Sequence, residues 1–240
     1  MFRVLPLGNS LTPNLATSYG IEDVRGYDAM TPRGWRLARE AIGHFRLDMM
    51  TVNGIAAHGQ GLDFWNIKYV IAAPDPRLTV GAVDRTLGLD LEEVYSGPDG
   101  RLWQNRRVLP RVRLTGPGEA GLERRTPIAW HIEVTAPSAV TLVVANPYFP
   151  GWRAQLDERP VAIWAHAGDA ITIAVPGGHH VVDFTYQPWT FRVGLAIGLV
   201  SLTFLLVVVL RPVLARCRSR RHRARGRRGT DESGASRLSC

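Results

Sequence analysis

Cysteine is nearly absent from this chain. Of its 240 residues only Cys217 and Cys240 are cysteines, and both follow a long apolar run near the C-terminus. No disulfide framework is therefore expected in the residues before that run. A secretion signal is lacking as well, because the first residues, MFRVLPLGNSLTPN, contain no apolar stretch of the roughly 7–15 residues that a signal peptide needs.

Signatures of catalytic and metal sites are also missing. The seven histidines show no HxxxH or HxH spacing, and His179 and His180 are neighbours that would point to opposite faces of a strand. Ser10 and Ser18 lie in no GxSxG motif. The glycine-rich stretch 116–121 is not followed by GK[ST], so it predicts a linker and not a phosphate loop. We therefore predict no metal, no cofactor and no catalytic residue.

The clearest feature that is present is the apolar run itself. Residues 193–210 carry no charge over 18 positions, which as a helix reach about 27 Å, close to the roughly 30 Å of a hydrocarbon core. Trp189 and Phe191 precede the run, where interfacial aromatic residues settle, and Arg211 can snorkel at its other end. A surface helix of a soluble protein would carry a polar stripe, which is absent here. We predict one transmembrane helix over residues 191–212.

Charge separates the end of the chain from the rest. Ten arginines and two acidic residues follow the run, which leaves 19 basic and 19 acidic residues in positions 1–210. Such a basic segment is typical either of a nucleic-acid or nuclear-localisation patch or of the cytoplasmic flank of a membrane helix. Its position directly after the run favours the second interpretation. We predict that residues 213–240 form a disordered cytoplasmic tail that contacts anionic lipid and no nucleic acid.

This orientation places residues 1–190 on the outer side of the plasma membrane. A span so near the C-terminus is a poor export signal for the nearly 190 residues that precede it. We therefore expect the chain to be the C-terminal piece of a larger polytopic protein. Membrane helices that are missing here, or that belong to a separate chain, would then deliver the outer part across the membrane.

The outer part predicts an α+β fold in two portions. Residues 1–75 mix short strands with a helix expected over residues 31–50, where Thr31 is the N-cap and Pro32 takes the first helical position. Residues 76–190 contain short strands separated by turn residues every 8–12 positions or so, which is typical of an antiparallel β-sandwich.

Alternation supports the sandwich. Trp130, Ile132 and Val134 alternate with polar residues, so one face of their strand should be buried against a second sheet. The segment LEEVYSGPDGRLWQN predicts a hairpin within the same portion, with GPDG as its turn.

Several sequence segments resemble those of a known family. In chain order they are FRVLPLGNSLTPNLATSYGIEDVRGYDAM, LDFWNIKYVI, VYSGPDGRLWQNRRVLPRV, NPYFPGWRAQLDERP and VPGGHHVVDFTYQPWTFRVG. Over about residues 2–210 their content and order resemble the C-terminal region of YfhO-like bacterial membrane proteins. The most distinctive blocks are YFPGWRAQLD (Tyr148–Asp157) and NRRVLPR (Asn105–Arg111).

The resemblance implies a polytopic protein similar to the GT-C class of glycosyltransferases, which use polyprenyl-phosphate sugars. The catalytic carboxylate of that class is expected in the first outer loop of a helical bundle. This sequence lacks the bundle, so no residue here inherits the catalytic role.

Several residues are candidates for contact with a glycan. Tyr148 and Trp152 could form a stacking platform, although aromatic residues at strand ends more often pack in the core. Tyr27 and Asp28 could bind a sugar hydroxyl or a cation, and so could Asp23, although carboxylates beside glycines more often cap turns.

A group of arginines could attract the phosphate of a lipid-linked donor, or could simply be solvated or ion-paired. They are Arg106, Arg107, Arg111 and Arg113. The function expected from the resemblance is participation in the transfer of a sugar from a polyprenyl-phosphate carrier to a cell-envelope glycan, with membrane lipid and the helical bundle as further partners. The alternative is a non-catalytic, membrane-tethered β-domain that binds a glycan or a partner protein.

Overall fold

The computed structural model of the chain describes residues 2–8, 10–12, 15–25, 59–77, 79–166 and 170–228. The chain divides into two units, Met1–Gln187 and Pro188–Cys240. The first unit contains one mixed β-sheet followed by two antiparallel sheets, and the second contains a single long helix. The helix predicted over residues 31–50 lies outside the described residues.

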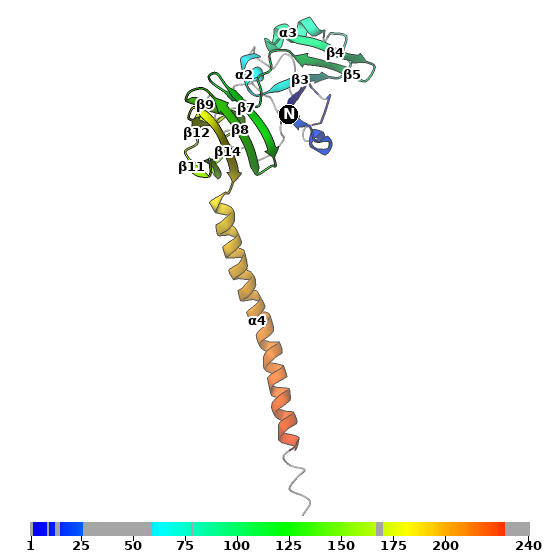
Figure 1. The fold of residues 1–240 in the computed structure, drawn as a ribbon. Coiled ribbons are helices and arrows are strands. Elements are labelled where there is room, and N and C mark those ends of the chain that lie inside the picture. Colours follow the sequence, from blue (N-terminus) through cyan, green and yellow to red (C-terminus); the bar gives the residue numbers. More distant parts are fainter. Residues whose placement is uncertain are drawn as a thin grey trace, which may run out of the picture. The chain divides into compact units, whose positions relative to one another are not determined.

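The mixed sheet is built from the N-terminal strands, in the order β2-β1-β3-β5-β4. Its strands are β1 (Arg3–Pro6), β2 (Glu22–Asp23), β3 (Ile67–Ala72), β4 (Leu91–Gly97) and β5 (Gly100–Asn105). β1 pairs in parallel with β2 and β3, whereas β5 pairs antiparallel with β3 and β4. Short helices connect them: η1 (Leu15–Tyr19), α2 (Gly59–Phe64) and α3 (Val80–Leu87). Figure 1 shows β3, β5 and β4 side by side, with α3 next to β4.

Local chemistry explains the bounds of these elements. All four residues of β1 are buried, as expected of a strand with parallel neighbours on both sides. Helix α3 begins after Thr79, whose Oγ1 accepts a hydrogen bond from the Ala82 N–H at 3.3 Å. It ends at Gly88, which adopts the left-handed conformation (φ 62°) that a side chain would strain.

The hairpin of β4 and β5 extends the mixed sheet beyond its predicted end. The sequence placed this hairpin in the sandwich portion, 76–190, but β5 pairs with β3 and the mixed sheet reaches Asn105. The physical reason is a cross-strand pair: Trp103 lies opposite Val70, and both side chains are fully buried in the core of this sheet. The hairpin itself is as predicted, with Gly97 opposite Gly100 across a two-residue turn.

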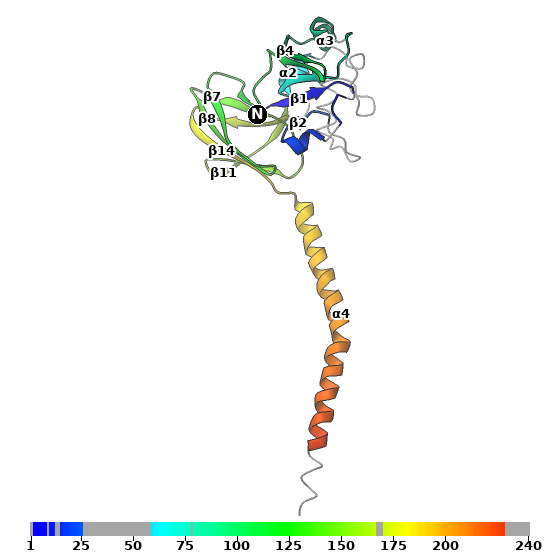
Figure 2. The ribbon, with the colours of Figure 1, turned by 90° about the vertical axis from the view of Figure 1, so that its right-hand side faces the viewer.

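The two antiparallel sheets form the predicted sandwich, with strand orders β11-β10-β14-β8-β7 and β12-β13-β9-β6. Their strands are β6 (Val112–Leu114), β7 (Glu119–Arg125), β8 (Ala129–Ala136), β9 (Val140–Pro147), β10 (Trp152–Leu156), β11 (Arg159–Val161), β12 (Trp164–His166), β13 (Ala170–Val175) and β14 (Gly178–Tyr186). Figure 2 shows β7, β8 and β14 as neighbouring strands.

Residues from both sheets share one hydrophobic core. On β8, Trp130, Ile132 and Val134 are buried, and Glu133 between them is exposed, so the predicted alternation is confirmed. They pack with residues of the second sheet such as Leu142 and Ile173. The fold class predicted from the sequence, α+β with a mixed portion, an antiparallel sandwich and a C-terminal apolar helix, is confirmed.

The second unit is helix α4 (Trp189–Arg228). Its first part, the 23 residues Trp189–Arg211, contains an 18-residue window with a mean hydropathy of 2.8 and is the one helix among the described residues that is long and apolar enough to cross a membrane. The helix continues through residues 213–228, where the sequence predicted disorder. Arginine, which makes up half of this stretch, is a good helix former, and extending an existing helix requires no new nucleus.

Candidate functional site

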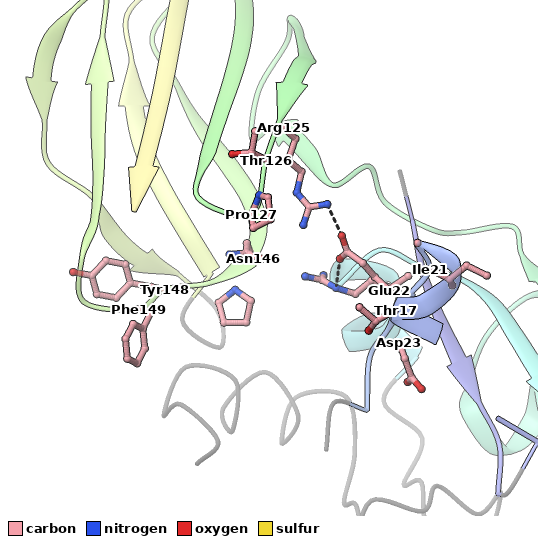
Figure 3. A pocket seen from close by; sticks show the side chains of 13 residues that line it. Thr17, Ile21, Glu22, Asp23, Arg125, Thr126, Pro127, Asn146, Tyr148 and Phe149 are labelled. Carbon is pink, nitrogen blue, oxygen red and sulfur yellow. Dashed lines mark hydrogen bonds and ion pairs between the residues drawn. The ribbon is translucent and has the colours of Figure 1, made fainter. Parts of the chain in front are cut away.

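A pocket of about 620 Å³ opens between the mixed sheet and the sandwich within the first unit. The mixed-sheet side contributes Arg3, Thr17, Gly20, Ile21, Glu22 and Asp23, and the sandwich contributes Arg125, Thr126, Pro127, Asn146, Pro147, Tyr148 and Phe149. Figure 3 shows Tyr148 and Phe149 on the sandwich side of this space, with Glu22 across from them. The lining therefore combines guanidinium groups, hydroxyl and amide groups and aromatic rings.

Glu22 is the centre of the charged part of the pocket. Its Oε2 accepts a hydrogen bond from Nη1 of Arg111 at 2.8 Å and lies 3.6 Å from Nε of Arg3. Its Oε1 accepts a hydrogen bond from Nη1 of Arg125, which reaches across from the end of β7 (Figure 3). One carboxylate on β2 is thus held by three arginines, two of which belong to the sandwich portion.

Burial and this cluster of charges together shift the pKa values of Glu22 and Arg3. Burial by itself raises the pKa of the Glu22 carboxyl, but attraction to Arg111 and Arg3, the hydrogen bond from Arg111 and attraction to Arg125 outweigh it, so the pKa falls from 4.5 to about 2. Burial, followed by repulsion from Arg111, lowers the pKa of Arg3 well below its ordinary value, with Glu22 opposing the shift. Glu22 is therefore ionised at neutral pH.

Backbone and aromatic contacts fix the arginines. Arg3 Nη1 donates to the carbonyl oxygens of Trp65 and Ala145, both at 2.8 Å, and so links the mixed sheet to β9. The guanidinium carbons of Arg111 and Arg125 lie 5.5 and 5.0 Å from the centre of the Trp130 ring. The geometry of the cluster is therefore set by both β portions and by the sandwich core.

The second carboxylate of the pocket is also engaged. Asp23 accepts hydrogen bonds from Nε of Arg25 at 3.2 Å and from Nη2 at 2.9 Å. The Arg25 side chain is fully buried and donates also to the Gly8 carbonyl at 3.0 Å. With a pKa of about 2, Glu22 is thus not suited to acid–base catalysis at neutral pH, and Asp23 is held in an ion pair with a buried arginine.

The two aromatic residues predicted as glycan contacts lie at or near this pocket. Tyr148 lines it, and both Tyr148 and Trp152 line an adjacent pocket of about 480 Å³ that also includes Arg153 and Gln187. Both aromatic residues are half-buried and pack against the sandwich core. The Trp152 ring lies 5.9 Å from that of Trp130 and 5.5 Å from that of Tyr186. Their contact with a glycan stays a prediction.

The candidates Tyr27 and Asp28 lie outside the described residues. Of the four arginines for which phosphate attraction or ion pairing was left open, Arg111 forms an ion pair with Glu22 in the pocket wall. The remaining three have partners elsewhere: Arg106 pairs with Asp90, Arg107 with Asp63, and Arg113 lies over the ring of Phe64.

The sequence analysis missed Arg3, Glu22 and Arg125. No spacing links these three positions, because they come from the first strand, the second strand and the end of the seventh. The first block of the resemblance contained Arg3 and Glu22, and no block contained Arg125. Nothing in the single sequence therefore indicated that these three residues come together.

None of the histidines among the described residues lines the pocket. His131 contacts Asp183 at 2.7 Å, and the neighbours His179 and His180 contact different partners, Thr135 at 3.0 Å and Asp157 at 2.7 Å. Within the described part of the chain, no group of three or more His, Cys, Asp or Glu residues could hold a metal ion.

Comparison with known proteins adds one finding. Residues 122–198 match the family described as bacterial membrane protein YfhO. The match begins in β7, includes Arg125, Tyr148 and Trp152, and ends within the apolar part of α4. No curated protein and no solved structure matches the chain. The resemblance predicted from the sequence is confirmed over this range, and together with the apolar helix it supports association with a membrane.

Proposed function

We propose that this YfhO-like chain is the outer domain and last membrane helix of a polytopic protein that takes part in transferring a sugar from a polyprenyl-phosphate carrier to a cell-envelope glycan. The role of the domain is to hold the sugar-phosphate end of the carrier, or the acceptor glycan beside it. The bond-making chemistry belongs to the helical bundle that accompanies the domain.

The observation that carries the proposal is the mixed lining of the pocket. Arg125, whose side chain is partly exposed, presents a guanidinium group, which suits the oxygens of a phosphate, and Tyr148 and Phe149 present rings on which the apolar face of a sugar can stack. Asn146, with Thr17 and Thr126, offers hydrogen-bonding groups suited to sugar hydroxyls. A volume of about 620 Å³ falls within the usual range of ligand sites, roughly 300–1,000 Å³.

The state of the carboxylates supports a binding role over a catalytic one. A general acid or base works best with a pKa near the working pH. Glu22, with a pKa of about 2, stays ionised and is a weak base. Asp23 is held by the buried Arg25. The pocket is therefore suited to positioning a ligand whose reaction is catalysed by other residues.

The proposed orientation follows from charge. The basic residues after Leu210 favour a cytoplasmic C-terminal end of α4, which places the pocket outside the cell. That is the side on which carrier-linked sugars would be delivered to envelope glycans in the GT-C-like scheme implied by the resemblance.

The test is binding of a polyprenyl phosphate to the full chain in lipid nanodiscs. Arg125→Gln should weaken binding by about tenfold, the loss expected when one charge-assisted contact worth about 1.5–3 kcal/mol is removed. Arg124→Gln is the matched control, because Arg124 is the exposed neighbour on β7, carries the same charge and does not line the pocket. Equal effects of the two changes would contradict the proposal. Binding of a phosphate-free glycan with no binding of the carrier would instead favour a tethered glycan-binding domain.

A further inference from the structure

The end of the sandwich from which the chain enters α4 carries apolar side chains that are exposed to solvent. Ile128 precedes β8 and Phe149 follows β9, and they are 59% and 39% exposed. Exposed Pro150 and half-buried Tyr186 complete this surface, which we call the helix-side rim. We infer that the helix-side rim inserts into the headgroup region of the same bilayer that α4 crosses.

Backbone hydrogen bonds join the rim to the residue that ends the first unit. The Gln187 N–H donates to the Gly151 carbonyl at 2.7 Å, and the Tyr186 N–H donates to the Ile128 carbonyl at 2.8 Å. The rings of Phe149 and Tyr186 lie 6.1 Å apart. The rim is therefore one connected structure, and it is fastened to the point where the chain leaves the sandwich.

Chain connectivity keeps that point close to the membrane surface. The apolar segment of α4 begins at Trp189, two residues after Gln187. Two virtual Cα–Cα bonds span at most about 7–8 Å, whatever conformation Pro188 adopts. The polar headgroup layer on each side of a bilayer is about 5–8 Å thick. Gln187 and the loops bonded to it are thus within reach of this layer.

The opposite end of the sandwich has a different composition. Its turns include residues 115–118, 137–139, 157–158 and 176–177, and none of these residues exposes a large apolar side chain. The strand β14 runs between the two ends, from Gly178 to Tyr186, a distance of about 26 Å at about 3.3 Å per residue. Of the two ends, the one that continues into the membrane helix therefore carries the exposed large apolar side chains, and exposed Trp164 lies on the edge strand β12 instead.

Lipid is the occupant that these features favour. Aromatic and large aliphatic side chains gather at membrane interfaces, and Trp189 and Phe191 at the start of α4, which are 67% and 68% exposed, continue the same composition along the chain. Phe149 of the rim also lines the large pocket, so insertion of the rim places this pocket beside the headgroups. That consequence rests on the proposed function, whereas insertion of the rim does not.

The test uses the full chain in liposomes of phosphatidylcholine and phosphatidylglycerol. Cys217 and Cys240 are replaced by serine, and a single cysteine that carries an environment-sensitive NBD label is introduced as Ile128→Cys or Pro150→Cys. Ser138→Cys at the far end of the sandwich is the control. Lipids with a nitroxide at the 5-position of the acyl chain should quench the label at positions 128 and 150 at least about threefold more strongly than at position 138.

Equal quenching at the three positions would overturn the inference. A label at position 128 that is shielded from water but not quenched by lipid would also overturn it, because a second copy or another protein would then cover the rim. Arg125→Gln in the same liposomes should leave the quenching unchanged. Loss of carrier binding and loss of rim insertion are therefore separate results.

Discussion

Arg125 at the end of β7 donates a hydrogen bond to the carboxylate of Glu22 on β2, although the two residues are 103 positions apart in the chain. The bond joins the sandwich to the mixed sheet at the wall of the large pocket. Arg111 and Arg3 contact the same carboxylate, so stability and the shape of the pocket depend on one side chain.

We expect Glu22→Gln to destabilise the first unit, Met1–Gln187, because the substitution leaves three clustered arginines without their shared anion. Removing one partner of a buried pair costs about 3–5 kcal/mol, and we expect about 2–3 kcal/mol here because the Glu22 side chain is 29% exposed. Urea unfolding of the full chain in detergent, followed by tryptophan fluorescence, measures the change. Asp90→Asn is the control: it breaks the exposed pair with Arg106 and should cost less than about 1 kcal/mol. Similar losses for both variants would contradict the special role of Glu22.

The same residue predicts a pH dependence of stability. The pKa of Glu22 is about 2 in the folded chain, below the ordinary value of 4.5. A carboxyl whose pKa is lowered by folding contributes its full stabilisation above its unfolded pKa and loses it as the pH falls toward the folded value. The difference in unfolding midpoint between the wild type and Glu22→Gln should therefore shrink as the pH is lowered from 5 toward about 2. A difference that stays constant over this range would show that Glu22 is not the titrating group.

The raised pKa of His180 predicts a second pH dependence of stability, opposite in sign to that of Glu22. Its hydrogen bond with Asp157 raises its pKa above the ordinary 6.5, with smaller contributions from the Gly177 carbonyl and from the charge of Asp157. A group whose pKa rises on folding stabilises fully below the unfolded pKa, and this stabilisation is lost as the pH rises through the folded value. NMR titration of the His180 ring should give a pKa above 6.5, and Asp157→Asn should lower it. Glu158→Gln, in the same exposed turn, is the control. It should lower the pKa less, because no hydrogen bond joins Glu158 to the ring.

Substitution of Trp152 tests whether this residue serves packing or ligand contact. Its ring contacts Trp130 and Tyr186, so Trp152→Ala should destabilise the domain by about 3 kcal/mol, the low end for loss of a core tryptophan. Trp164→Ala removes a tryptophan that is 47% exposed on β12 and should cost less than about 1 kcal/mol. Thermal unfolding of both variants compares them. Equal stability of the two would show that Trp152 is retained for ligand contact alone.

The native cysteines test the proposed orientation without any substitution in the tail. Cys217 and Cys240 are the two cysteines of the chain, and both follow the apolar segment. A membrane-impermeant maleimide should label neither in intact cells and both after permeabilisation. Ser138→Cys should be labelled in intact cells, because the sandwich would lie outside. Labelling of the native cysteines from outside would reverse the orientation.

Structural features that depend on residues close together in the sequence could be predicted. An uncharged run such as 193–210 identifies a membrane helix because the bilayer requires a minimum apolar length, and the alternation on β8 identifies a buried face because strand side chains alternate every two residues. The ordered blocks identified the YfhO-like region, which matches over residues 122–198. Tyr148 and Trp152 could be selected as candidates because they are aromatic residues at the ends of predicted strands.

What only the tertiary structure decided are relationships between distant residues. Alternation shows that the hairpin of β4 and β5 has a buried face but not which sheet receives it, and the pairing of Trp103 with Val70 decided this. The gathering of Arg3, Arg111 and Arg125 around Glu22 has no local periodicity, because a charge meets its partner through the packing of two sheets. The sequence by itself determined the elements and the membrane segment through local chemistry, whereas the pocket arose from long-range contacts that only the folded chain brings together.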